Sequence, residues 1–154
     1  MTQIPRPALW LGLAGLIPFF WGVAGLHSKA LDDISTVIFG PDPRLNGAGL
    51  VLSYGIVILS FMSGVLWGFA TRVTTQAGLY YTLSALPALW AQFFVSNSGL
   101  QSLVLLAMGY LALLALDWVF ATKGLTPAWW MRLRILLTTG VLASIALAAL
   151  GSGD

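Results

Sequence analysis

The chain has 154 residues, of which 58% are hydrophobic and 8% charged, and its mean hydropathy is +0.90. These values exclude an ordinary water-soluble domain. The formal net charge of +2 comes from charges scattered at the ends of apolar runs, which argues against nucleic-acid binding. Without cysteine there is no disulfide, thiolate or thiol nucleophile, and one histidine with few dispersed acids indicates neither a metal site nor a cofactor.

Apolar runs predict an all-α polytopic membrane bundle that forms a single integral membrane domain over residues 1–154. Each run reaches the length needed to cross a hydrocarbon core about 30 Å thick at about 1.5 Å per residue. The five predicted spans cover residues 8–26, 48–70, 76–95, 100–121 and 127–150. After the first span, Ile34, Val37 and Ile38 recur at helical spacing beside Asp32 and Asp33, which predicts a short helix in the membrane interface.

The first span contains a proline and a glycine face. Pro18 has no N–H for the carbonyl of Ala14, so the helix should bend there. The bend either serves packing or exposes that carbonyl to a cavity. Gly15 and Gly22 lie on one side of the helix, where close packing against a neighbour is expected.

The second span has a face of small residues. Ser60, Gly64 and Gly68 recur every four residues, so they form a shallow groove into which another helix is expected to pack.

Polar residues in the third and fourth spans are candidates for ligand binding. Tyr81, Ser84 and Gln92 follow one side of the third span and should face protein, because unpaired polar groups are costly in lipid. Together with Tyr110 they are predicted to line a cavity for a small apolar or amphipathic molecule.

Asp117 is the only acid within a predicted span. If a short loop joins antiparallel helices, Asp117 lies at a depth similar to those of Arg132 and Arg134, so either arginine is its expected ion-pair partner. Two interpretations stay open: a structural clamp at the membrane edge, or a proton relay through Tyr110.

No catalytic residue is predicted. Carboxylate-based hydrolysis needs a second acid near Asp117, and Ser-His-Asp chemistry fails because His27 and Asp117 fall on opposite sides of the bilayer. The chain is therefore expected not to be an enzyme.

The distribution of basic residues predicts the orientation. Five spans place five basic residues on one side and two on the other, namely Arg6, Arg72, Lys123, Arg132 and Arg134 against Lys29 and Arg44. This excess favours a cytoplasmic N-terminus. The expected location is the inner membrane of a cell, or of an organelle in a eukaryote.

Several stretches resemble one family. They are Leu11 to Pro18, Tyr54 to Gly68, Leu86-Pro87, Asp117, Leu133-Arg134 and Leu137-Thr138. On these residues the chain resembles the domain of unknown function 3429 family, which also includes the eukaryotic transmembrane protein 69. The resemblance implies a small multi-span membrane protein and no particular activity. Ser63 stands where a second glycine is expected, and Leu66 where a polar residue often precedes Trp-Gly.

The leading hypothesis is a non-enzymatic accessory or assembly factor that associates laterally with a membrane-protein partner in the lipid bilayer. Its basis is the small-residue faces, the few ionisable groups and the lack of a soluble domain. The alternatives are a binding protein for an apolar small molecule and a proton-coupled transporter.

Overall fold

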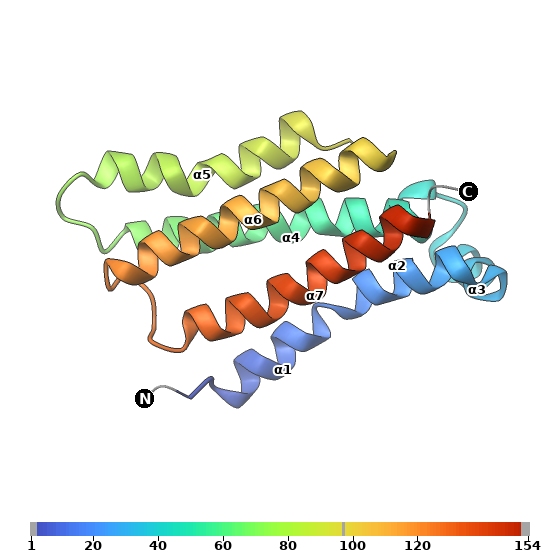
Figure 1. Ribbon diagram of the computed structural model, residues 1–154, viewed down its shortest axis with the longest axis horizontal. Coiled ribbons are helices and arrows are strands. Elements are labelled where there is room, and N and C mark those ends of the chain that lie inside the picture. Colours follow the sequence, from blue (N-terminus) through green and yellow to red (C-terminus); the bar gives the residue numbers. More distant parts are fainter. Residues whose placement is uncertain (1–2, 97, 152–154) are drawn as a thin grey trace.

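A computed structural model describes residues 3–96 and 98–151. The helices are α1 (Arg6–Ala14), α2 (Ile17–His27), α3 (Lys29–Phe39), the 3-10 helix η1 (Pro43–Leu45), α4 (Gly47–Ala70), α5 (Ala77–Phe94), α6 (Leu100–Thr122) and α7 (Trp130–Gly151). These residues include no strand, so the predicted all-α class is confirmed. In Figure 1, α4, α5, α6 and α7 lie alongside one another, each antiparallel to the one before. Further contacts join α2 to α4 and α7, and α4 to α6.

Four segments are helical, long and apolar enough to cross a membrane: Arg6–His27, Gly47–Ala70, Leu100–Thr122 and Trp130–Gly151. They match four of the five predicted spans. The exception is α5, which has 18 residues and was predicted as the span 76–95. Its hydropathy is lowered by polar and hydroxyl-bearing side chains, namely Tyr80, Tyr81, Thr82, Ser84 and Gln92.

The first span is broken where the proline predicted a bend. α1 ends at Ala14 and α2 begins at Ile17. Pro18 donates nothing to the Ala14 carbonyl, and Leu16 N–H instead reaches the Leu13 carbonyl at 3.0 Å, a tighter turn than an α-helix makes. On the N-terminal side of this break, α1 has no fully buried residue and packs mainly against α7. It therefore diverges from α4 (Figure 1).

A helix is present at the place predicted for a short interfacial one. α3 follows α2 directly, and Trp21 Nε1–H donates to Ser35 Oγ at 2.8 Å, which ties α3 to α2. Ile34, Val37 and Ile38 are exposed on its surface. An exposed apolar face on a short amphipathic helix suits the membrane interface.

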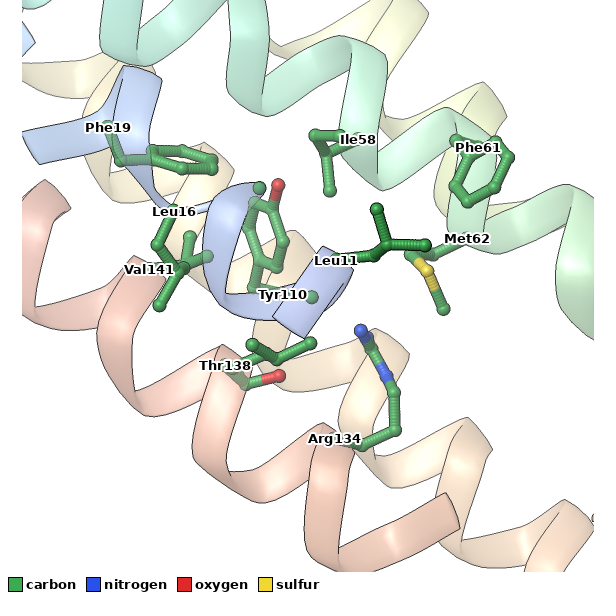
Figure 2. A pocket seen from close by; sticks show the side chains of 13 residues that line it. Leu11, Leu16, Phe19, Ile58, Phe61, Met62, Tyr110, Arg134, Thr138 and Val141 are labelled. Atoms are coloured by element: carbon green, nitrogen blue, oxygen red, sulfur yellow. The ribbon is translucent and has the colours of Figure 1, made fainter. Parts of the chain in front are cut away.

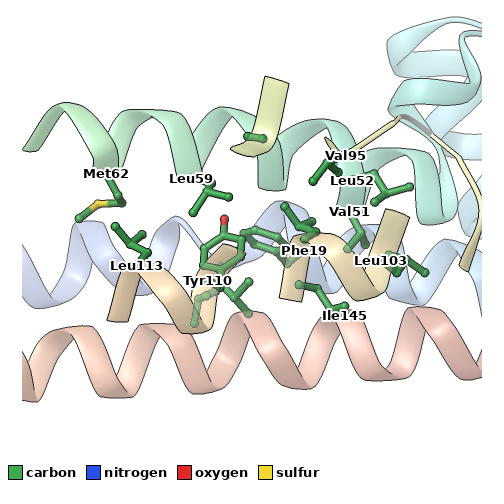
Figure 3. Close-up of a cluster of buried hydrophobic side chains, with 14 of the residues drawn as sticks. Phe19, Val51, Leu52, Leu59, Met62, Val95, Leu103, Tyr110, Leu113 and Ile145 are labelled. Atoms are coloured by element: carbon green, nitrogen blue, oxygen red, sulfur yellow. The ribbon is translucent and has the colours of Figure 1, made fainter. Parts of the chain in front are cut away.

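The core lies between α4 and α6, with α2 and α7 closing it (Figure 3). Phe19, Leu59 and Tyr110 are buried there, and the Tyr110 hydroxyl donates to the Gly55 carbonyl at 2.9 Å. Gly55 also lets Leu106 of α6 pack closely against α4, since a Cβ at that position would lie 2.6 Å from Leu106 Cδ2. A backbone carbonyl thus satisfies the one polar atom of the largest buried side chain.

Glycine faces pack differently from the prediction. A Cβ at Gly22 would lie 2.8 Å from the Gly47 carbonyl oxygen, so α2 and α4 do approach closely at this glycine. At Gly15 the nearest atom is the carbonyl oxygen of Gly12 in the same helical segment.

The expected contact of Gly64 and Gly68 with another helix is wrong for the described chain, because no atom lies within 4 Å of a Cβ at either position. The reason is the rotation of α4 about its axis. Leu52, Leu59 and Leu66 occupy its buried side, which turns the two glycines outward.

Candidate functional site

A buried ion pair joins α6 to α7. Asp117 on α6 is 0% exposed and Arg134 on α7 is 4% exposed. Arg134 Nε–H donates to Asp117 Oδ2 at 2.6 Å. Of the two arginines predicted as partners of Asp117, Arg134 is therefore the one that forms the ion pair. Arg132 lies two residues away, roughly 200° around the helix, and its side chain is exposed.

The second oxygen of the carboxylate has its own donor, which the sequence prediction missed. Trp130 Nε1–H donates to Asp117 Oδ1 at 2.7 Å, and the Trp130 ring packs edge-on against Phe69 with centroids 5.1 Å apart. The sequence did contain a signal for this donor. A buried carboxylate needs a hydrogen-bond donor for each of its oxygens, and Trp130 carries an indole N–H at the start of α7.

This geometry matches a structural clamp more closely than a proton relay. Both oxygens of Asp117 accept hydrogen bonds from Arg134 and Trp130, while the Tyr110 hydroxyl is directed to the Gly55 carbonyl. A relay from Tyr110 to Asp117 has no hydrogen bond in the described residues to carry it.

A cavity of about 260 Å³ lies beside the ion pair, between α1, α2, α4 and α7 (Figure 2). Its walls are mainly apolar and include Leu16, Phe19 and Met62. Arg134 and Thr138 also line it, and Figure 2 shows both side chains directed toward it from α7. Arg134 Nη2 and Thr138 Oγ1 are buried without a hydrogen-bond partner among the described residues.

The cavity opens where α1 diverges from α4. Leu11 on α1 and Phe61 on α4 both line it, and they are 74% and 65% exposed. Both side chains belong to segments apolar enough to cross a membrane, so we expect the mouth of the cavity to face acyl chains in a bilayer.

The structure does not bring the four predicted ligand residues together. Tyr110 lines the cavity just described, whereas Ser84 lines a groove of about 300 Å³ between α4 and α5. Tyr81 packs its ring against Trp67 with centroids 4.7 Å apart, and Gln92 is exposed. The prediction of one shared cavity is therefore wrong. Tyr110 lies on the side of α4 that faces the core, whereas Ser84 lines the groove between α4 and α5.

Outside the spans, Asp42 and Arg44 form an exposed ion pair at 2.7 Å next to η1. Hydrogen bonds from the Arg44 side chain and backbone N–H hold the pKa of Asp42 at about 2, below its ordinary value of 3.8. The pair is therefore charged at neutral pH and fixes the turn before α4.

Four helical segments long and apolar enough to cross a membrane, two of them joined by a buried ion pair, indicate a multi-pass helical membrane protein. The chain belongs to the family described as "Protein of unknown function (DUF3429)", whose model matches residues 4–150. Transmembrane protein 69 of Xenopus tropicalis is 33% identical over 150 residues, which cover 94% of this chain and 54% of that protein. The chain thus spans about half the length of this curated relative. No solved structure matches it.

Proposed function

We propose that the protein is a non-enzymatic accessory factor that associates laterally with a larger membrane complex through α4. The observation that carries this proposal is the open position of Gly64 and Gly68, beside which the described chain places no atom within 4 Å of a Cβ. Glycine on a lipid-facing surface lets the backbone of a second helix approach closely. The occupant of this face is a transmembrane helix of the partner.

The neighbouring surface supports such a contact. Ser60, Gly64 and Ala88 line the groove between α4 and α5, together with Trp67. Small side chains and hydroxyl groups stabilise helix pairs in lipid through close packing and hydrogen bonds. Within the chain's own fold, close helix packing occurs at Gly22, where α2 meets α4. The face of α4 that carries Gly64 and Gly68 makes no such contact, so it is open to a helix of the partner.

The test is copurification at native expression in mild detergent, followed by mass spectrometry. Gly64→Leu combined with Gly68→Leu should reduce the recovery of the partner at least about tenfold, equivalent to about 1.4 kcal/mol. A Cβ added at either position meets no other part of the described chain within 4 Å, so we expect the bundle to fold as before.

Gly78→Leu is the matched control, because Gly78 is exposed on α5 and equally open. A wild-type protein that remains a lone monomer contradicts the proposal. So does a partner retained by the double variant.

We also propose that α5 completes five crossings, with the N-terminus cytoplasmic in the inner membrane. At 18 residues α5 is about 27 Å long, close to the thickness of the hydrocarbon core, and Figure 1 shows it running alongside α4 and α6. Arg134 is neutralised by Asp117 and Arg44 by Asp42, which changes the predicted excess of basic residues from five against two to four against one without reversing it.

A further inference from the structure

We propose that the cavity beside the ion pair binds an apolar molecule dissolved in the bilayer through a neutral carbonyl oxygen. The residues that recognise this oxygen are Arg134 and Thr138. This site is separate from the open α4 face and does not depend on the accessory role.

The donors are the first reason. Arg134 is 4% exposed and Thr138 is 2% exposed, and each has a polar atom without a partner in the described chain. Unpaired polar groups are costly in an apolar environment. The residues are four apart, so they lie on one side of α7, and both side chains are directed toward the cavity (Figure 2).

The other hydroxyl groups of α7 show that Thr138 is unusual. Thr139 Oγ1 donates to the Ile135 carbonyl at 2.8 Å, and Ser144 Oγ donates to the Gly140 carbonyl at 2.9 Å. Thr138 makes no such bond within its helix, although it is buried as Ser144 is. Its hydroxyl group is therefore the one on this stretch of α7 that the described chain leaves unpaired beside the cavity.

Charge and depth select the kind of acceptor. Asp117 already neutralises Arg134, so an anionic ligand would add an unpaired negative charge to a low-dielectric site, whereas a neutral carbonyl adds none. Thr138 lies eight residues beyond Trp130, about 12 Å along the helix, which is too deep for a phosphate headgroup. The ligand is thus a molecule that resides within the hydrocarbon core.

Size and access agree with this chemistry. A volume of about 260 Å³ holds a ring or a short stretch of chain, and the mouth between Leu11 and Phe61 lets an apolar tail extend into the bilayer. Two sources share the required chemistry: a quinone ring and a fatty ester.

The experiment measures binding of four probes to the purified full-length chain in lipid nanodiscs. Decyl-benzoquinone and methyl oleate carry neutral carbonyls, oleate carries an anion, and 1-octadecene has no acceptor. We expect a neutral carbonyl probe to bind at least about tenfold more tightly than 1-octadecene and oleate. The tighter of the two carbonyl probes identifies the source.

The variant is Thr138→Val, which removes the unpartnered hydroxyl and leaves the Asp117 ion pair intact. It should weaken binding of the carbonyl probe about fivefold, the effect of one neutral hydrogen bond, and leave 1-octadecene unchanged. Thr139→Val is the matched control, since this neighbouring side chain is exposed and bonded within α7.

Three outcomes overturn the proposal. The first is a wild-type affinity for 1-octadecene equal to the affinity for both carbonyl probes. This result is expected if water alone satisfies the polar atoms of the cavity. The second is a preference for oleate, and the third is unchanged carbonyl binding in Thr138→Val.

Discussion

Asp117 illustrates what a carboxylate needs when it is fully buried in a membrane helix. Arg134 supplies the opposite charge and one donor, and Trp130 supplies the second donor. Removing one partner leaves an acceptor unsatisfied where no water competes, which is costlier than losing an exposed ion pair. The contacts join the first turns of α7 to the last turns of α6, so the three residues hold the helical hairpin closed.

Trp130→Phe tests this clamp. Phenylalanine keeps a ring beside Phe69 but cannot donate to Asp117 Oδ1, so the free energy of unfolding should fall by about 1.5–3 kcal/mol, as for hydrogen bonds to charged groups. Denaturant unfolding in detergent measures the change. Trp129→Phe is the control and should stay within about 0.5 kcal/mol, because the carboxylate keeps both donors. Equal effects of the two variants would show that the indole bond does not stabilise the fold.

At the scale of the helix, rotation about the axis decides what a small residue does. Gly22 faces α4 and allows backbone contact, while Gly64 and Gly68 face outward although their four-residue spacing is the more regular. In α4 the large apolar side chains occupy the interior, which fixes the direction of the small ones. Spacing alone identifies a face but not its neighbour.

Gly22→Ala and Gly68→Ala should therefore behave in opposite ways. The new methyl group at Gly22 would lie 2.8 Å from the Gly47 carbonyl oxygen and 2.9 Å from Val51 Cγ2, and we expect a loss of about 1–3 kcal/mol from overpacking. At Gly68 the methyl group meets nothing, so the helix should be unchanged or gain up to about 1 kcal/mol from helix propensity. Unfolding curves in one detergent compare them, and a neutral Gly22→Ala would refute the close approach.

For the whole molecule, the break between α1 and α2 determines access to the interior. The helices α2, α4, α6 and α7 pack against one another, whereas α1 leans away from α4 (Figure 1). The cavity lies beside α1, with the exposed side chains of Leu11 and Phe61 among its lining. The resulting architecture combines a clamped hairpin, a lipid-facing cavity and an open helix face on α4. The proposed ligand and the proposed partner thus use different surfaces.

Cysteine labelling tests the five crossings, because the chain has no cysteine of its own. Thr74→Cys and Ser98→Cys introduce thiols at exposed positions before and after α5. In intact cells a membrane-impermeant reagent should label the second and not the first, since α5 separates a cytoplasmic loop from an external one. Equal labelling would contradict a crossing by α5, and reversed labelling would contradict the orientation.

The sequence by itself determined the all-α membrane class, four of the spans, the bend at Pro18 and the depth at which Asp117 meets α7. These follow from composition, run length and the rise per residue, which are local properties. Only the tertiary structure decided that Arg134 rather than Arg132 is the partner, that Trp130 completes the clamp, and that Gly64 faces outward. Each of these depends on how a helix is rotated about its axis, and that rotation is fixed by packing all the helices at once.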